Sequence, residues 1–377
     1  MKVIIAGDFA SEARAAKLIE EKRFSEVFPE NLREIVHSAD VSFVNFESPV
    51  VEDGYMPIPK CGPNLHCTPE AAEAVKFAGF TGVTMANNHI LDFGADGLYK
   101  SVECCKSQGL HVVGVGDNLK DAGKVLYVKN EGKTLAVINC CEHEFSIATE
   151  TEAGANPSNP IRQFYTIQEA KKKADYVLVI VHGGHEMFQL PSPRMVETYR
   201  FFVDAGADAV VNHHQHCYSG YEVYNGKLIF YGLGNFCFDE DGQRSCPWNE
   251  GYMAMIDFKE SGIQYELYPY TQCDKNAAVS LMSDKTAFLR EIDNLNDIIA
   301  NQTLLQKECS NYYSSTTDSF NILLQPYENR VLNKLFRMGL LPSMVSKRKK
   351  LRVLNYVYCE SHYDKFVFAL KHILFKK

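Results

Sequence analysis

Short apolar runs that end on polar residues recur along most of the chain. The run at residues 2–6 is rich in β-branched side chains and is followed at once by Gly7 and Asp8, as expected for a buried strand that ends in a polar loop. Between such runs apolar residues recur at helical spacing, and Thr68-Pro69-Glu70 supplies a cap, a proline and an early acid where one helix should begin. Strands are therefore predicted over residues 2–6, 41–46, 82–85, 111–114, 125–129, 134–139, 176–181, 209–211 and 227–231. Helices are predicted over residues 12–21, 30–38, 68–78, 97–108, 167–174, 194–205 and 286–300.

The regular alternation of strands and helices predicts an α/β fold in which helices cover a β-sheet. Residues 49–69 are rich in proline and glycine and are predicted to form a loop. After about Asp274 helical periodicity dominates. In that part, the serine and threonine run at residues 314–317 is expected to be a loop, and residues 346–350 are strongly basic. The chain is thus expected to divide into residues 1–273 and residues 274–377.

Composition narrows the class of protein. With 46% hydrophobic and 23% charged residues, the chain can bury a sizeable core. The formal net charge of −8 argues against a general nucleic-acid binder, which would carry a clustered basic excess. The first apolar run is too short for a signal sequence or a membrane span, so a soluble, cytoplasmic protein is expected. The twelve cysteines include no CxxC spacing, which favours free buried thiols over a structural zinc site.

Carboxylates, asparagines and histidines gather directly after five of the predicted strands. Taken alone, each cluster has an ordinary explanation, because an acid there is often a helix cap and a single histidine is most often a core or loop residue. Together the clusters lie where open α/β sheets bind ligands, and their oxygen and imidazole donors suit Mn, Fe or Zn. The pattern therefore favours a metal-dependent hydrolytic site. Its members are Asp8; Asn45 and Glu47; Asn87, Asn88, His89 and Asp92; His182, His185 and Glu186; and His213, His214 and His216.

In their order and spacing these clusters resemble the CapA family of capsule-synthesis, or poly-γ-glutamate-synthesis, proteins, which belongs to the metallophosphatase-like (calcineurin-like) superfamily. The resemblance covers about residues 1–272. It implies a metallophosphatase-like layered α/β sandwich with central mixed β-sheets over residues 1–273, followed by a helical C-terminal extension over residues 274–377. The matching pieces are Gly7-Asp8, Asn45-Phe46-Glu47, Ala86-Asn87-Asn88-His89 with Asp92 and Gly94, His182-Gly183-Gly184-His185-Glu186, His213-His214-Gln215-His216 and the run at residues 229–236.

The resemblance also implies roles for individual residues. Asp8 and His216 would hold one divalent metal ion. Asn88, His182 and His214 would hold a second ion, and Glu47 would bridge the two. His89 would stabilise the phosphoryl charge and protonate the leaving oxygen. Residues expected to contact the substrate or support the ligands are Asn45, Asn87, Asp92, His185, Glu186, His213 and Asn235.

The chain departs from the superfamily pattern at two positions. Ala10 stands where a histidine is usual, and Glu47 stands where the bridging residue is usually an aspartate. A site with a single metal ion therefore remains an alternative to the site with two.

Two functions of different class follow from the resemblance. The favoured one is a phosphoesterase-like hydrolase that acts on a small-molecule or polymer substrate during synthesis of a capsule polysaccharide, poly-γ-glutamate or another surface polymer. The alternative is a non-catalytic, metal-binding accessory protein of the polymer-synthesis machinery. No nucleic-acid partner is expected. For the basic C-terminal tail, a terminal helix docked on the body is favoured over weak peripheral contact with an anionic membrane.

Overall fold

Two mixed β-sheets form the centre of the computed structural model, which describes residues 1–260, 262–327 and 329–375. The first sheet has the strand order β16 (Val279–Leu281), β15 (Gly262–Gln272), β14 (Glu250–Lys259), β1 (Lys2–Ala10), β2 (Val41–Phe46), β3 (Gly82–Thr84) and β4 (His111–Val113), and β13 (Asn235–Phe238) also pairs with β1. The second sheet has the order β11 (Tyr221–Tyr224), β12 (Lys227–Phe230), β10 (Ala209–His213), β9 (Tyr176–His182), β7 (Lys133–Cys141) and β6 (Leu126–Asn130). The short strands β5 (Val115–Gly116) and β8 (Gly154–Ala155) pair with each other.

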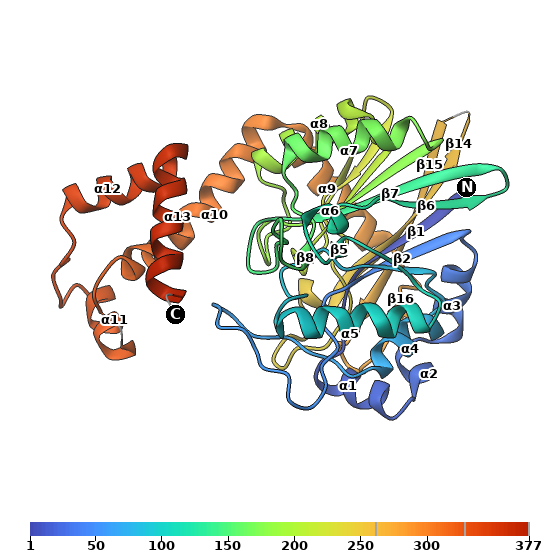
Figure 1. Ribbon diagram of the computed structural model, residues 1–377, viewed down its shortest axis with the longest axis horizontal. Coiled ribbons are helices and arrows are strands. Elements are labelled where there is room, and N and C mark those ends of the chain that lie inside the picture. Colours follow the sequence, from blue (N-terminus) through green and yellow to red (C-terminus); the bar gives the residue numbers. More distant parts are fainter. Residues whose placement is uncertain (261, 328, 376–377) are drawn as a thin grey trace. The chain divides into compact units, whose positions relative to one another are not determined.

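Helices cover the outer side of each sheet (Figure 1). One set packs with the first sheet: α1 (Ala13–Glu20), α2 (Phe24–Val27), α3 (Glu30–His37), α4 (Glu70–Phe77) and α5 (Gly94–Ser107). The helices α7 (Pro160–Lys171) and α8 (Pro193–Ala205) pack on β7, β9, β10 and β12 of the second sheet. Short helical turns occur at α6 (Leu119–Ala122) and η1 (Pro247–Asn249). The predicted layered α/β sandwich with mixed sheets is confirmed.

The chain divides into two units, Met1–Gln306 and Lys307–Lys377. The first unit holds both sheets and also α9 (Thr286–Ala300), which packs on β11 and buries Phe288, Ile292 and Leu295. The helices α10 (Gln302–Leu323), α11 (Arg330–Arg337), α12 (Lys347–Tyr358) and α13 (Glu360–Phe375) follow, so the predicted C-terminal helices are confirmed. The domain boundary expected after residue 273 stays a prediction. No helix in the described part of the chain is long and apolar enough to cross a membrane.

Several local predictions differ from the structure. The strand expected at residues 2–6 continues to Ala10, because its second half pairs with β2 and β13. The helix expected from residue 167 begins at Pro160, where Asn159 caps it, and strands β13 to β16 were not predicted. The loop expected at residues 314–317 is wrong, since this run lies within α10. There the hydroxyls donate to carbonyls three or four residues earlier, as in the 2.7 Å bond from Ser314 Oγ to Ser310 O, and this satisfies them inside the helix.

The cysteines are mostly core residues. Nine of the twelve are buried, as predicted. Burial raises the pKa of Cys140 to about 12, as expected for an unreactive core thiol.

Gly7 marks the closest approach between β1 and the segment before β13. A Cβ atom placed on Gly7 would lie 1.8 Å from the carbonyl oxygen of Gly234, which accepts a hydrogen bond from Asp8 N at 3.2 Å. No side chain fits in that space. The glycine therefore lets two backbones meet directly beside Asp8.

We predict that Gly7→Ala lowers the free energy of unfolding by about 1–3 kcal/mol, because the added methyl group forces the two backbones apart. Urea denaturation with a metal chelator present measures this without a contribution from metal binding. Gly123→Ala is the matched control, since the nearest atom to its Cβ would be Leu119 O at 3.4 Å. Equal unfolding midpoints for the two variants would contradict the role of Gly7.

Candidate metal centre

Polar side chains from both sheets meet at the carboxyl ends of the strands. Asp8 belongs to β1, Glu47 directly follows β2 and His182 is the last residue of β9. His214 and His216 lie in the loop after β10. All five are buried, and Asp8 and Glu47 are 0% exposed. The strand ends that the sequence pattern singled out therefore bring these side chains to one place.

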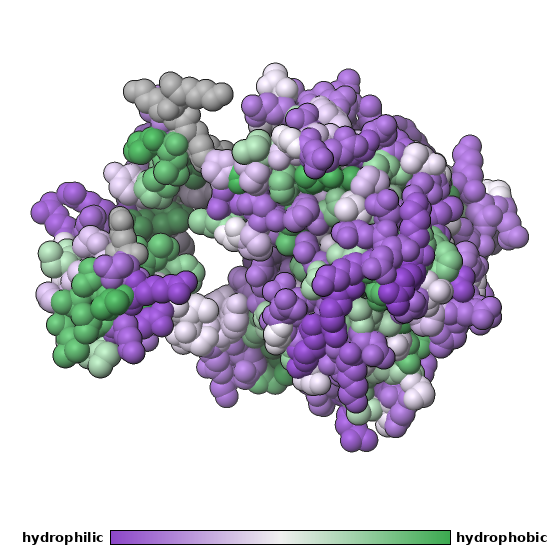
Figure 2. Space-filling view, turned by 90° about the horizontal axis from the view of Figure 1, so that it is seen from below, coloured by the Kyte–Doolittle hydropathy of each residue, from purple (hydrophilic) through white to green (hydrophobic). Residues whose placement is uncertain are grey.

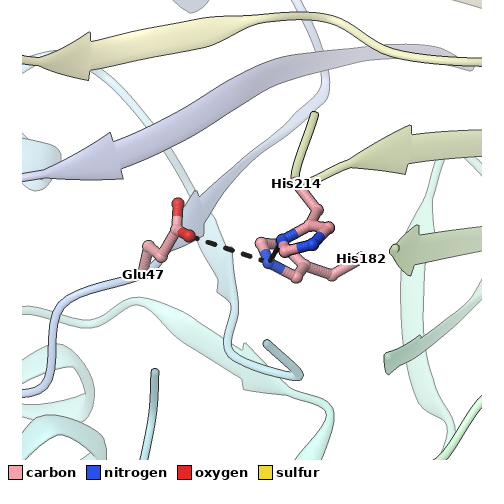
Figure 3. A group of neighbouring side chains, drawn as sticks. All are labelled: Glu47, His182 and His214. Carbon is pink, nitrogen blue, oxygen red and sulfur yellow. Dashed lines mark hydrogen bonds and ion pairs between the residues drawn. The ribbon is translucent and has the colours of Figure 1, made fainter. Parts of the chain in front are cut away.

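Glu47 lies at the centre of the group. Its Oε1 is 3.7 Å from His182 Nε2 and 3.8 Å from His216 Nε2. Nδ1 of His214 in turn lies 3.1 Å from His182 Nε2, and Figure 3 shows the Glu47 carboxylate facing this pair of rings. Both Glu47 oxygens are buried and have no hydrogen-bond partner among the described residues. A buried carboxylate in this state needs a cation or a proton.

Asp8 joins the two sheets at the edge of the group. Its Oδ1 accepts a hydrogen bond from Asn45 Nδ2 at 2.8 Å, and its Oδ2 accepts one from the backbone N of His214 at 3.0 Å. The same Oδ2 is 3.6 Å from His216 Nδ1. Asp8 therefore helps to hold the loop after β10 against the end of β1.

The loop after β10 has an unusual backbone. His214 and His216 have φ angles of 92° and 55°, in the left-handed region that non-glycine residues rarely adopt. Gln215 between them donates from Nε2 to Phe188 O at 2.9 Å. Such strain costs of order 1–3 kcal/mol per residue and is found mainly at functional sites. Here the strained residues are the two histidines whose imidazoles lie near the buried Glu47 carboxylate.

Burial sets the charge states of these side chains. It lowers the pKa of His214 to about 3 and the pKa of His182 well below its usual value, so both imidazoles are neutral near pH 7. Burial also raises the pKa of Glu47 well above its usual value, and the nearby charges of Asp8, Glu186 and Asp92 raise it further. A bound cation would reverse the penalty on the carboxylates and would accept the neutral imidazoles as ligands.

The donor atoms fit a divalent ion in two overlapping groups. Asp8, Glu47 and His216 each offer a ligand atom within 4.8 Å of the others, and so do Glu47, His182 and His214. Glu47 belongs to both groups. A third group, Glu186 with His214 and His216, includes an exposed carboxylate. Oxygen and imidazole donors of this kind suit Mn, Fe or Zn.

Three asparagine side chains lie close to the candidate metal ligands or to the strand ends that carry them. Asn88 Oδ1 lies 3.0 Å from His182 Nε2, and the role of Asn88 as a metal ligand stays a prediction. Asn235 Oδ1 lies 2.9 Å from His216 Nδ1, so it orients the ring with Nε2 toward Glu47. Asn87 donates from Nδ2 to Phe46 O at 2.9 Å and supports the strand end rather than the centre.

His89 and Asp92 form a buried pair beside the centre. The distance from His89 Nδ1 to Asp92 Oδ2 is 2.7 Å, and Asp92 also forms an ion pair with Lys60. The Lys60 side chain is 2% exposed. Sequence reasoning missed Lys60, because it lies in the proline- and glycine-rich loop and follows no predicted strand.

The remaining predicted residues lie around the group rather than in it. His213 Nε2 is 2.9 Å from Ala6 O, which ties the end of β10 to β1. His185 is partly buried and its ring lies 6.4 Å from that of Phe188. A cavity of about 110 Å³ opens on the His182 and His214 side of the group, lined by these two residues, Asn88 and residues 141–144, 183 and 184. Glu142 in this lining also accepts hydrogen bonds from Gly184 N and Arg194, another feature that no sequence signal indicated.

Two mixed sheets bring carboxylates and imidazoles together at their strand ends, which makes this an α/β protein with a candidate metal centre. The chain belongs to the family described as bacterial capsule synthesis protein PGA_cap, whose family model matches residues 2–240. The resemblance to CapA proteins is thereby confirmed.

Individual relatives agree with this family. The chain is 37% identical over 209 residues to the capsule biosynthesis protein CapA of Bacillus anthracis, an alignment that covers 53% of this chain and about half (51%) of the relative. It is 33% identical over 268 residues to the PGA biosynthesis protein CapA of Bacillus subtilis, covering 70% of this chain and 69% of that protein. Among solved structures, a phosphatase of Mycoplasma pneumoniae has a TM-score of 0.45 at 15% identity, covering 73% of this chain and 95% of that one.

We predict that the purified protein carries about one to two divalent ions per chain, and that Asp8→Ala and His214→Ala each weaken metal affinity by at least about tenfold, since each removes a ligand. Elemental analysis after dialysis measures the ions. His111→Ala, at an exposed position on β4, is the matched control and should keep the wild-type content. Unchanged content in both ligand variants would rule out a metal site here.

Proposed function

We propose that the chain is a divalent-metal-dependent, phosphoesterase-like hydrolase that acts in the synthesis or modification of a capsule or other surface polymer. The observation that carries the proposal is the buried carboxylate of Glu47, which has no hydrogen-bond partner in the described part of the chain. It is shared by two groups of ligand atoms beside the His89–Asp92 pair. The polymer class comes from the names of the CapA relatives, one for capsule and one for PGA biosynthesis.

The proposed roles follow the two groups of ligand atoms. Asp8 and His216 would hold one ion, Asn88, His182 and His214 would hold a second, and Glu47 would contribute to both. Bound ions would polarise a phosphoryl oxygen of the substrate and neutralise its developing charge. We propose Mn, Fe or Zn as the ions, because the ligands are oxygen and imidazole.

His89 is the proposed general acid. Its ring is about nine-tenths buried and is held by Asp92 through Nδ1, so Nε2 is the nitrogen that exchanges a proton with the leaving oxygen. Because Asp92 is an acceptor, it keeps the ring in one orientation while that proton moves. Asn45, Asn235 and His213 brace the surrounding strand ends.

A second candidate is a non-catalytic accessory protein of a polymer-synthesis complex that keeps the metal site for ligand binding. Two observations favour it: the cavity on the His182 and His214 side of the group holds only about 110 Å³, and Ala10 offers no ligand where a histidine is usual. In either case the polymer-synthesis machinery is the proposed partner.

We predict hydrolysis of an aryl phosphate ester that Mn stimulates and a chelator abolishes. His89→Asn should lower kcat by at least about tenfold through loss of the acid while the metal content stays unchanged. Steady-state kinetics and elemental analysis on the same preparations measure both. A metal-loaded protein that cleaves no member of a broad ester panel would support the accessory function instead.

We also propose that the C-terminal unit makes weak peripheral contact with an anionic membrane. From Lys307 onward the chain has 13 Lys and Arg against five Asp and Glu, a formal charge of +8 within a chain of −8. The helix α12 contains no acidic residue, and none of its residues is buried. Apolar side chains that α12 and α13 leave exposed, including Leu354, Val357, Phe368 and Ile373, add hydrophobic surface. Figure 2 shows hydrophobic residues, in green, on the surface of the C-terminal unit. Basic and apolar side chains on the same helices are typical of binding to a membrane surface.

We predict that the full chain sediments with vesicles containing anionic phospholipid at low salt. Neutralising Lys347, Arg348 and Lys349 to Gln should reduce the bound fraction at least tenfold, because each basic residue contributes about 1 kcal/mol near such a surface. A triple variant of exposed lysines in the first unit, at Lys106, Lys120 and Lys173, is the matched control. Equal sedimentation of the two triple variants would exclude the membrane contact.

A further inference from the structure

The loop at residues 49–69 converges on Asp92. Ile58 donates its backbone N–H to Asp92 O at 2.8 Å, and Asn64 donates from Nδ2 to the same oxygen at 3.0 Å. Leu65 donates its backbone N–H to Asp92 Oδ2 at 2.7 Å. These hydrogen bonds attach the loop to the site through Asp92.

The same loop places the buried ammonium group of Lys60 beside the site. The Lys60 side chain is 2% exposed, and its Nζ pairs with Asp92 Oδ1. Nζ also lies 3.1 Å from His89 Nδ1 and 5.6 Å from the centre of the Phe145 ring. Taking an ammonium out of water costs several kcal/mol unless partners compensate for it. The buried charges of Lys60 and Asp92 therefore stabilise each other.

The three side chains fit together in one protonation pattern. An ionised carboxylate only accepts hydrogen bonds, so at 2.7 Å from Asp92 Oδ2 the Nδ1 of His89 must carry the proton and donate it. Lys60 then forms an ion pair with the other oxygen, Asp92 Oδ1. The Lys60 ammonium beside Nδ1 has no acceptor there, so its contribution passes through the carboxylate. This leaves Nε2 of His89 as the nitrogen available to a substrate.

We infer that Lys60 is a positioning residue for His89: it fixes the Asp92 carboxylate, which in turn fixes the tautomer and orientation of the imidazole. The inference rests on the proposed function, in which His89 is the general acid. Lys60 forms an ion pair with Asp92 Oδ1 and lies 3.1 Å from His89 Nδ1. Its main effect should therefore be seen in proton transfer, and Lys60→Arg keeps the positive charge that also acts on Glu47.

The first test uses the metal-loaded full chain and two phosphate esters. Lys60→Met should lower kcat for phenyl phosphate about tenfold with KM and metal content unchanged, since only a step after binding is affected. With 2,4-dinitrophenyl phosphate, whose leaving oxygen needs little protonation, the loss should shrink to less than about threefold, as it should for His89→Asn. Lys60→Arg keeps the cation and should recover most of kcat. Lys22→Met removes a lysine from the exposed ion pair with Glu73 and is the matched control.

The second test does not depend on turnover. Nitrogen-15 NMR of the histidine side chains, with His89 assigned by comparison with His89→Asn, should show the Nδ1-protonated form in the wild type and in Lys60→Arg. In Lys60→Met it should show a mixture of tautomers. An unchanged tautomer, a loss of metal, or equal losses of kcat for both esters would overturn the role of Lys60. A fully active His89→Asn variant would instead overturn the proposed function, and the NMR result would still decide the positioning of His89.

Discussion

The burial of Glu47 is the constraint on which the rest of the site depends. Its carboxylate is fully buried, has no hydrogen-bond donor among the described residues, and lies within 4 Å of two histidine rings whose pKa values burial has lowered. Such an arrangement is unfavourable for the isolated chain, because the carboxyl group must either hold a proton or remain uncompensated. It becomes favourable once a divalent cation lies between the carboxylates and the imidazoles. Burying Glu47 therefore lowers the free energy of unfolding, and it keeps a set of candidate ligand atoms close together.

Other features of the fold hold this unfavourable group in place. Gly7 lets β1 and the segment before β13 meet closely enough to form the hydrogen bond from Asp8 N to Gly234 O. The left-handed residues His214 and His216 are held by the hydrogen bond from His214 N to Asp8. Gly7 and the left-handed residues both lie at the junction of the two sheets. A site built between sheets in this way is positioned by the strand ends and by a loop that is hydrogen-bonded to them, as precise ligand geometry requires.

Much of the fold and the core of the site could be predicted, because buried strands that end on polar residues leave a clear pattern. The strand at Val41–Phe46 and the helix at Thr286–Ala300 have the predicted bounds. The prediction failed where distant contacts decide the structure. The second half of β1 exists because β13 pairs with it, and nothing near residue 60 signals that its loop is attached to Asp92. At Ser314 the failure was local: the run is helical and its hydroxyls bond to carbonyls of the preceding turn, which composition alone does not reveal.

Anomalous X-ray diffraction from crystals grown with Mn tests the central claim most directly, because it locates ions without reference to activity. The account predicts two anomalous peaks about 3.5–4 Å apart, with the carboxylate of Glu47 between them and Asp8 and His182 on opposite sides. A single peak bound to Glu47 would favour the site with one ion. The absence of any peak beside Glu47, with its carboxyl group hydrogen-bonded to protein instead, would contradict the account.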